Sequence, residues 1–232
     1  MTVYLLKASE LADETIGRMT AALPENRRGH AARLKRGPAR AESVAGSYLV
    51  YYALLSAQLK GTADCGVVFP MPERLIAEHE KIAALAARIG WTAGGHGKPF
   101  PQGVDTGGAN YHISLSHSGG LVAAAVADRP VGVDIQRIPD IPLSRMKKIA
   151  ARFHPDEYER LDSLPDDRYA AAFCGMWACK ESVLKLTGRG LSVSLSSFRV
   201  SEDGVCALDG KSIKLTVNSW YDAWIAAAVC AE

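Results

Sequence analysis

Leu121-Val-Ala-Ala-Ala-Val126 and Trp224-Ile-Ala-Ala-Ala-Val229 are the two segments that decide the predicted fold of this chain. They begin 103 positions apart, and each follows a turn after another predicted strand, at residues 113–116 and 213–217. An alanine-rich match of this length is a weak indication of duplication when taken alone. It nevertheless predicts two halves of similar size, residues 1–129 and 130–232, each mixing helices with antiparallel strands in an α+β fold.

The composition is that of a folded globular protein. Of the 232 residues, 48% are hydrophobic and 22% are charged, which excludes a disordered or collagen-like chain. The length allows one large domain or two small ones. The formal net charge of +2 is too small to mark the whole molecule as a binder of nucleic acid or of a membrane surface, so partners must be sought in local clusters.

Neither a membrane span nor a secretory signal is predicted. The longest unbroken apolar run covers residues 223–231, which is nine residues, whereas a membrane-spanning helix needs about 20. The N-terminus lacks a basic lead-in and soon meets acidic residues. The five cysteines are odd in number and contain no Cys-x-x-Cys, which argues against a disulfide framework or a zinc site. We therefore expect reduced thiols in a cytoplasmic protein.

Local signals place most of the helices and strands. We expect a strand at residues 2–6, a helix at 11–23, and amphipathic helices that begin at Pro38 and Pro72 and run to about residues 61 and 89. Further strands are expected at 111–116, 121–127 and 131–135, helices at 142–151 and about 166–187, where Gly188 supplies the stop, and strands in the tail. Residues 94–108 contain six glycines and two prolines, which predicts a long loop.

A basic stretch precedes and enters the helix that begins at Pro38. Between residues 27 and 40 lie six Lys or Arg residues and one histidine, with no acidic residue from 26 to 41. Such a run is most often a solvated face, but it could also hold phosphates.

The strand at 131–136 carries the first candidate functional residues. Its sequence, Val131-Gly-Val-Asp-Ile-Gln136, alternates, so the apolar residues share one face while Asp134 and Gln136 lie on the other, about 7 Å apart. Two interpretations are open: a half-exposed strand with a surface aspartate, or a pair of oxygen ligands for a hard cation such as Mg2+.

The helix at 166–187 carries a second set of candidate functional residues. Lys180 falls on its apolar stripe, where an ammonium must either extend to solvent or meet an anion. Glu181 and Lys185 are four residues apart and share an adjacent face, so they form either a surface ion pair of a few tenths of a kcal/mol or part of a site. One carboxylate and two lysines on one helix suit Mg2+ and a diphosphate.

A histidine lies at the end of the strand before Leu121, in Ser114-Leu-Ser-His-Ser-Gly-Gly120. Such a histidine is more often structural than catalytic, and Ser and Gly are ordinary turn residues. Spacing alone gives no basis for a Ser-His-Asp triad. The segment Gly94-Gly-His-Gly-Lys98 is not a phosphate-binding Walker loop, because it lacks that spacing and the helix that follows it.

Taken together, these segments resemble the Sfp-type 4'-phosphopantetheinyl transferases of the holo-acyl-carrier-protein synthase superfamily. The resemblance covers about the last 140 residues densely and the first 90 loosely. It is carried, in this order, by Gly97-Lys-Pro99, Ser116-His-Ser118, Gly132-Val-Asp-Ile-Gln136, Arg152-Phe-His-Pro-Asp-Glu157, Trp177-Ala-Cys-Lys-Glu-Ser182, Lys185 and Gly188-Arg-Gly-Leu191.

The resemblance implies an enzyme, a holo-(acyl-carrier-protein) synthase. Such an enzyme transfers 4'-phosphopantetheine from coenzyme A to a serine of an apo acyl, peptidyl or polyketide carrier protein and releases adenosine 3',5'-bisphosphate. It also implies a pseudo-dimer of two similar α+β subdomains with the active site at their interface. The expected partners are coenzyme A and the carrier, with no nucleic acid and no membrane, and the expected state is a monomer.

The resemblance further implies roles for individual residues. Asp134 and Glu181 resemble the family's metal-binding carboxylates, which hold Mg2+, or Mn2+ in its place, on the diphosphate of coenzyme A. Gln136 is a third candidate ligand, although many bacterial relatives carry Glu there; an amide adds no negative charge, so we expect Mg2+ to depend less on it than on Asp134. The other expected contacts are Lys180 and Lys185 for the phosphates, Ser116 and His117 for the 3'-phosphoadenosine, Lys98 and Pro99 for the adenine, and Arg36 and Arg40 as further phosphate contacts.

The implied mechanism agrees with the residue types. Transfer of a phosphoryl-type group needs positioning and charge neutralisation, which a metal and lysines provide, and the nucleophile belongs to the carrier. We expect the catalytic residues to be Asp134, Lys185 and Glu181, with Glu181 as the base, acting directly or through a metal-bound water.

Three alternatives are open. The same residues could serve a Mg2+-dependent hydrolase of coenzyme A or nucleotide diphosphates, with water as the nucleophile. A non-catalytic coenzyme A-binding or carrier-docking module is disfavoured by the presence of both Asp134 and Glu181. A nucleic-acid binder would depend on residues 27–40, which lack interleaved aromatic residues for stacking.

Overall fold

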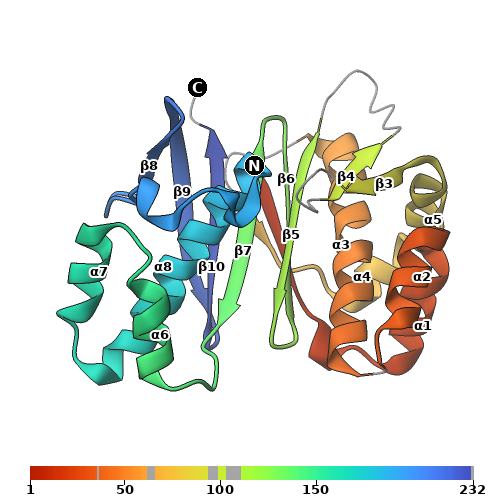
Figure 1. Cartoon of the computed structure of the whole chain (residues 1–232). Helices are drawn as coiled ribbons and strands as arrows, with labels where there is room; N and C mark the ends of the chain where they lie inside the picture. The colour runs from red at the N-terminus through yellow and green to blue at the C-terminus, as the bar shows by residue number, and fades with distance from the viewer. Residues whose placement is uncertain (36, 62–65, 94–98, 103–110, 231–232) are drawn as a thin grey trace. The chain divides into compact units, whose positions relative to one another are not determined.

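The computed structural model of the chain describes residues 1–35, 37–61, 66–93, 99–102 and 111–230, with the backbone alone at 60, 90–93, 99–102 and 191. The chain divides into two compact units, Met1–Val131 and Gly132–Glu232 (Figure 1). The sequence placed the boundary between residues 129 and 130. Each unit is described by itself below.

The sheet of the first unit has four strands in the order β2-β1-β6-β5. The strand β6 (Leu121–Ala127) lies in the middle, and each of its seven residues is buried. It pairs antiparallel with β1 (Thr2–Lys7) and with β5 (His112–Ser118), and β2 (Gly66–Val68) runs parallel to β1. A separate hairpin of β3 (Gly90–Ala93) and β4 (Pro99–Gln102) places a strand where the glycine and proline content predicted only a loop.

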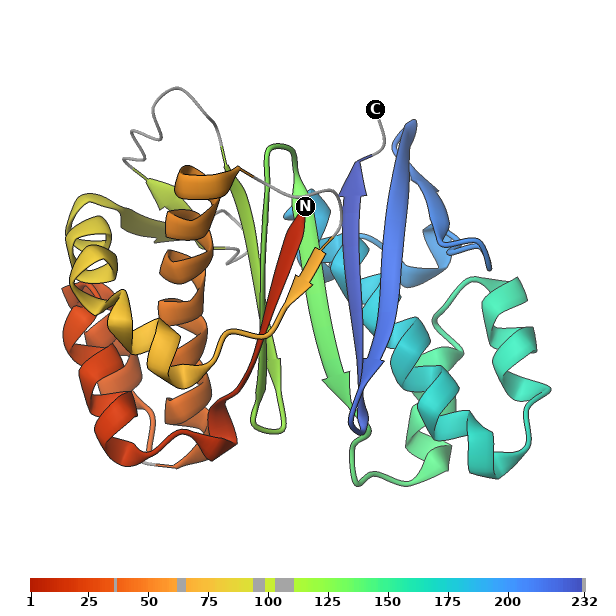
Figure 2. The same ribbon diagram turned by 180° about the vertical axis from the view of Figure 1, so that it is seen from behind.

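The helices of the first unit lie on one side of this sheet, as Figures 1 and 2 show. The longest, α3 (Pro38–Lys60), begins at the predicted proline and ends at Gly61, as expected. Gly46 lets it approach the sheet, since a Cβ there would lie 3.0 Å from Leu115 Cδ1. The others are η1 (Ala8–Glu10), α1 (Asp13–Ala22), α2 (Glu25–Arg33), α4 (Pro72–Ala77) and α5 (His79–Arg88).

The single helix predicted from Pro72 to residue 89 is wrong, because the structure breaks it at Glu78. In a continuous helix the carbonyl of Leu75 would accept a hydrogen bond from the backbone of residue 79. At the break, Glu78 has φ −92° and ψ 10°, and the carbonyl of Leu75 also accepts a hydrogen bond from the hydroxyl of Tyr48 on α3, at 3.1 Å. This contact between distant residues leaves no local signal.

The second unit repeats the plan. Its sheet has the order β7-β10-β9-β8, with β10 (Ala223–Cys230) between β7 (Val131–Arg137) and β9 (Lys211–Trp220), and with β8 (Val205–Leu208) at the edge. The 22-residue helix α8 (Asp166–Thr187) packs on this sheet and ends at the predicted Gly188, whose φ is 71°. The remaining helices are α6 (Leu143–Ala150), α7 (Pro155–Asp162), η2 (Gly190–Ser192) and η3 (Leu195–Ser197).

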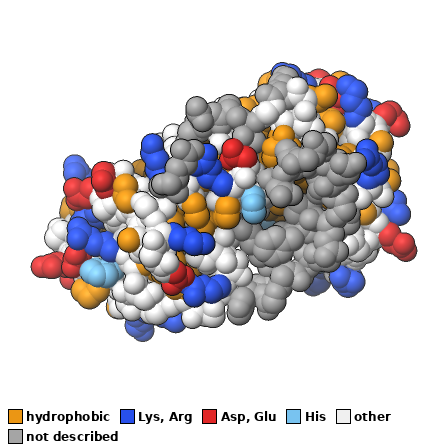
Figure 3. Space-filling model, turned by 90° about the horizontal axis from the view of Figure 1, so that it is seen from above, with side chains coloured by type: hydrophobic (Ala, Val, Ile, Leu, Met, Phe, Trp, Pro, Cys, Tyr) orange, Lys and Arg blue, Asp and Glu red, His pale blue; other side chains and the backbone are white. Residues whose placement is uncertain are grey.

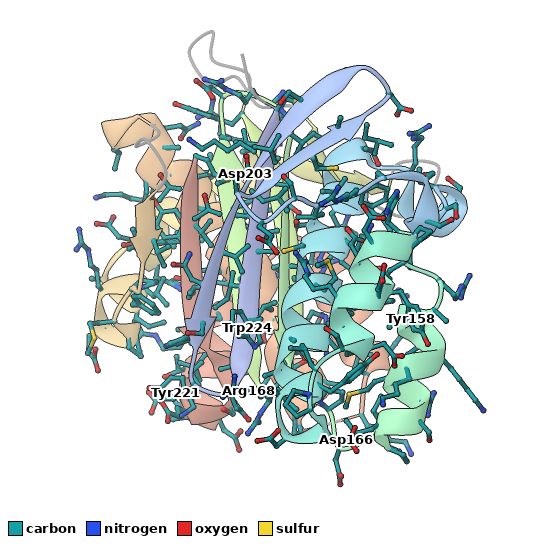
Figure 4. All side chains as sticks on the ribbon, turned by 90° about the vertical axis from the view of Figure 1, so that its left-hand side faces the viewer. Tyr158, Asp166, Arg168, Asp203, Tyr221 and Trp224 are labelled. Atoms are coloured by element: carbon teal, nitrogen blue, oxygen red, sulfur yellow. The ribbon has the colours of Figure 1, made fainter. Side chains whose placement is uncertain are left out.

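A glycine again brings the long helix close to the central strand. A Cβ on Gly175 of α8 would lie 3.3 Å from the ring of Trp224, which is labelled on β10 in Figure 4. On the same helix Phe173 stacks on Phe153, with the ring centroids 6.0 Å apart, and Trp177 packs against Phe153 in a tilted arrangement at 6.1 Å. These contacts form the core that fixes the rotation of α8.

The α+β class with two similar subdomains is confirmed. The two alanine-rich segments are the central strands, and in both units the long helix packs on that strand. Small side chains suit this place because they let the helix backbone come near the sheet. On the face shown in Figure 3, basic, acidic and apolar side chains are interspersed, in keeping with a net charge of +2. Among the described residues, no helix is both long and apolar enough to cross a bilayer.

Candidate functional site

The strand β7 is buried on both faces. Residues 131–135 are all buried, and the Asp134 residue is 5% exposed. The interpretation of a half-exposed strand with a surface aspartate is therefore wrong, because α8 covers the face that carries Asp134.

Gly132 explains how closely β7 approaches α8. A Cβ built on Gly132 would lie 1.9 Å from the carbonyl oxygen of Ser182 and 2.5 Å from the backbone nitrogen of Leu186. No side chain fits there without moving the strand. Asp134 lies two residues further along the same face of β7, and this close approach brings it to the helix turn that carries Glu181 and Lys185.

Asp134, Glu181 and Lys185 form one electrostatic cluster. The Lys185 ammonium donates to Asp134 Oδ1 at 2.6 Å. Burial raises the pKa of the Glu181 carboxyl, the negative charge of Asp134 raises it further, and Lys185 opposes the rise. The side chain of Lys185 is 28% exposed, so the cluster is accessible at the lysine. Two described carboxylates thus lie close to the Lys185 ammonium.

This donor set fits a hard divalent cation. Mg2+ prefers carboxylate oxygens, keeps several waters, and commonly takes only one or two protein carboxylates together with substrate phosphates. Among the described residues there is no group of three or more His, Cys, Asp or Glu side chains that could enclose a metal ion. Asp134 and Glu181 are the residues of this cluster that could hold such a cation.

Gln136, the third predicted ligand, lies near the end of β7 and is half-buried. Its amide Nε2 donates to the carbonyl of Arg137 at 3.0 Å. The structure thus gives its amide nitrogen a backbone partner, and the part it plays toward a metal stays a prediction.

Lys180 does not fit its predicted role as a phosphate ligand. Its side chain is 0% exposed, and its ammonium lies 2.6 Å from Glu157 Oε2, 2.9 Å from the carbonyl of Leu195 and 2.5 Å from that of Phe198. Burial lowers the pKa of this lysine, and the hydrogen bond that its ammonium donates to Glu157 opposes the shift. Because an ammonium has three N–H donors, these partners leave none for a phosphate. The predicted role of Lys180 as a phosphate ligand is therefore wrong, because its side chain lies on the core side of α8.

Glu157 is a structural residue to which the sequence reasoning assigned no role. It is 1% exposed and accepts hydrogen bonds from the backbone of His154, at 3.1 Å, and of Val200, at 2.7 Å, besides its contact with Lys180. The first of these belongs to a capping box at the start of α7. The sequence held one indication of such a residue: Lys180 lies on an apolar stripe, where its ammonium needs an anionic partner.

The first unit presents His117 on β5, beside the hairpin turn. Its side chain is 48% exposed, and its Nδ1 lies 2.7 Å from Glu42 Oε2, from α3. Ser116 is buried, and successive strand side chains alternate, so it points to the opposite face of β5. The structure thus places Ser116 and His117 on opposite faces of β5, and the contact of each with a nucleotide stays a prediction. Glu42 was not predicted.

The other predicted contacts are only partly described. Arg40 is a half-buried residue in the first turn of α3. Pro99 begins β4, and its side chain is not described; Arg36 and Lys98 lie outside the described residues. Elsewhere in the basic stretch, Arg27 donates to Ser47 Oγ at 2.8 and 3.0 Å, so it joins α2 to α3.

In the comparison with known protein families, the match falls on the second unit of the chain. Residues 130–229 match the family model of the 4'-phosphopantetheinyl transferase superfamily, which confirms the resemblance inferred from the motifs. The chain is similar to 4'-phosphopantetheinyl transferase psf-1 of Bacillus pumilus, with 44% identity over 133 residues, 56% of this chain and 54% of that protein. It is also similar to 4'-phosphopantetheinyl transferase gsp of Aneurinibacillus migulanus, with 36% identity over 109 residues, 47% of this chain and 42% of that protein.

The chain spans about half the length of the curated relatives it matches. Among solved structures there is a distant likeness to a holo-(acyl-carrier-protein) synthase from Bacillus anthracis str. Ames in complex with CoA (3',5'-ADP). The TM-score is 0.36 and the identity 20%, over 44% of this chain and 94% of that one.

Proposed function

We propose that this chain, whose residues 130–229 match the 4'-phosphopantetheinyl transferase superfamily, transfers 4'-phosphopantetheine from coenzyme A to a serine of an apo carrier protein. The serine oxygen forms a bond to the phosphorus that carries pantetheine. The bond from that phosphorus to the 5'-phosphate of the nucleotide breaks, and adenosine 3',5'-bisphosphate leaves. The single observation that carries the proposal is the cluster of Asp134, Glu181 and Lys185.

In this reaction Asp134 and Glu181 would hold Mg2+, or Mn2+ in its place. Bound there, the cation would supply charge neutralisation at the diphosphate. Lys185 is half-buried and already oriented by Asp134, so its ammonium is positioned to bind a phosphate oxygen of the substrate. Because the lysine is fixed before the substrate arrives, little reorganisation is needed during the reaction.

Glu181 is the proposed acceptor of the proton from the carrier serine. Burial and the negative charge of Asp134 raise the pKa of its carboxyl, so its carboxylate is a stronger base than that of an exposed glutamate. The positive charge of Lys185 opposes this rise of the pKa. No serine of this chain needs activation, because the carrier brings the nucleophile.

The nucleotide contacts form a second part of the proposal. His117 is the proposed contact to the 3'-phosphate, and Arg40 is a further basic candidate in the same unit. Arg36, Lys98 and Pro99 stay as proposed contacts on the ground of the motif resemblance alone. Lys180 is withdrawn, for the reason given above.

We further propose that the protein works in the cytoplasm as a monomer, on carriers of the fatty-acid, polyketide or peptide-synthetase type. The described cysteines support a reducing compartment: Cys174, Cys179, Cys206 and Cys230 are free thiols. Burial raises the pKa of Cys174 and Cys206 to about 11 and of Cys179 to about 12, so these three are poorly reactive.

The proposal is tested by incubating the full chain with coenzyme A, Mg2+ and a panel of apo carriers and measuring the intact mass of each carrier. At least one carrier should gain phosphopantetheine; Asp134→Asn should abolish the gain, and Lys185→Met should slow it about 100-fold. A matched control is Arg168→Met, an exposed position at the other end of α8, which should leave it unchanged. If no carrier is modified, the proposal is refuted, and release of adenosine 3',5'-bisphosphate without a carrier would favour the hydrolase.

A further inference from the structure

The first unit contains a buried carboxylate that lies outside the proposed metal site. Glu42, in the second turn of α3, is 8% exposed. Its Oε2 lies 2.7 Å from Nδ1 of His117, and its Oε1 accepts from the backbone N–H of Gly120 at 2.5 Å. A buried carboxylate is costly unless its oxygens are hydrogen-bonded, and here each oxygen has a partner. The contact joins α3 to the β5–β6 hairpin, 75 residues away.

This contact determines which nitrogen of His117 carries the proton. An ionised carboxylate only accepts hydrogen bonds, so Nδ1 must be the protonated nitrogen of the neutral ring. Nε2 is then the nitrogen available to a ligand, and it lies on the far side of the ring from Glu42. The side chain is 48% exposed, so a ligand can reach it.

We propose that Glu42 is a positioning residue that holds His117 in the Nδ1-protonated form, with Nε2 directed toward an anionic group of the substrate. This inference rests on the proposed function, under which that group is the 3'-phosphate of coenzyme A. With the phosphate bound, the doubly protonated imidazole donates from Nε2 to the phosphate and from Nδ1 to Glu42. The cationic ring thus lies between two anions.

The charges give the proposal an unusual consequence. Glu42 is itself an anion, so it favours phosphate binding only through the ring of His117. Without that ring its charge would repel the phosphate. Removal of the Glu42 charge should therefore weaken binding in the wild-type protein, and should leave binding unchanged or improve it when His117 is alanine.

A purely structural role for Glu42 in the turn is the competing explanation, and Gly120 supplies a matched control. The turn residues Gly119 and Gly120 have φ of 58° and 87°, which suits a two-residue hairpin turn. A Cβ on Gly120 would lie 2.8 Å from Ser9 Cβ. Gly120→Ala therefore strains the turn while it leaves both carboxylate and imidazole in place.

The experiment compares the affinity of the full chain for coenzyme A and for dephospho-coenzyme A, which lacks the 3'-phosphate, by calorimetry. Glu42→Gln should weaken binding of coenzyme A about tenfold, the scale of a lost charge-assisted hydrogen bond, and leave dephospho-coenzyme A unaffected. In a His117→Ala background the same change should cause no loss. Gly120→Ala should lower the melting temperature without this discrimination between the two ligands.

The form of the His117 ring is measured separately by 15N NMR of the wild-type imidazole, which needs no variant to fold. The neutral ring should carry its proton on Nδ1, and a ring protonated on Nε2 would overturn the proposal. Equal weakening of both ligands by Glu42→Gln would also overturn it, since that would show a role in folding alone. These measurements do not require turnover. If no carrier is modified, the proposed function is refuted, but the binding and NMR results still test the role of Glu42.

Discussion

Lys180→Met is expected to destabilise the protein by about 3–5 kcal/mol, because it leaves Glu157 as a buried carboxylate without its cation. The figure follows from the surroundings of the pair, in which both side chains are at most 1% exposed. Glu157 keeps its two backbone donors, which moderates the loss. Methionine is close to lysine in length, and its apolar end would lie where the Lys180 ammonium now faces the ring of Phe198, 4.1 Å from the ring centroid. The loss is a large part of the total stability of a domain, about 5–15 kcal/mol.

The assay is urea unfolding followed by circular dichroism, together with coenzyme A binding in native conditions. A loss of 3–5 kcal/mol corresponds to a drop in melting temperature of about 10 °C. Glu157→Gln in the Lys180→Met background should recover part of the loss, since it removes the unpaired charge. Lys185→Met serves as the contrast: this lysine is partly exposed, so its loss should cost less stability and lower turnover about 100-fold.

The reasoning would be refuted by a Lys180→Met protein that unfolds at the same urea concentration as wild type but binds coenzyme A much more weakly. That pattern would make the ammonium a phosphate ligand, as the motif suggests, and the buried pair with Glu157 unimportant.

Three further predictions concern the cluster. Gly132→Ala should cost a few kcal/mol and most of the activity, because its Cβ would lie 1.9 Å from the carbonyl of Ser182; wild-type turnover would contradict this. Glu181→Gln should make the metal-free protein more stable at neutral pH. The pKa of Glu181 is raised above its ordinary 4.5, so ionisation costs stability, and the advantage should vanish below pH 4.5; equal melting temperatures at all pH values would contradict it. Gln136→Ala should retain more Mg2+-dependent turnover than Asp134→Ala, and equal loss would reverse that ranking.

The parts of the fold that were predicted correctly depend on local signals. Pro38 and Gly188 mark helix ends because each sets the conformation of its own backbone, so the bounds of α3 and α8 are readable. The break at Glu78 was missed because the apolar spacing continues across it, and the contact of Leu75 with the hydroxyl of Tyr48, 27 residues away, leaves no mark on that spacing. A pattern read along the chain carries no information about such a partner.

The same distinction applies to the candidate site. The motifs pointed to Asp134, Glu181 and Lys185, and the structure brings these three together through Gly132, whose missing Cβ sets the spacing. The sequence could not show that Lys180 is satisfied by a glutamate on another helix. The motif resemblance implied that Lys180 binds a phosphate, whereas its burial and its contact with Glu157 make it a structural residue.

The central claim, that the Asp134, Glu181 and Lys185 cluster serves group transfer to a carrier, is tested most directly by the stoichiometry of one reaction. The full chain is mixed with coenzyme A, Mg2+ and an apo carrier, and both the modified carrier and adenosine 3',5'-bisphosphate are quantified over time. The account predicts that the two products appear in equal amounts and that neither appears with Asp134→Asn. Bisphosphate formed in excess of modified carrier, or formed in the absence of a carrier, would contradict it.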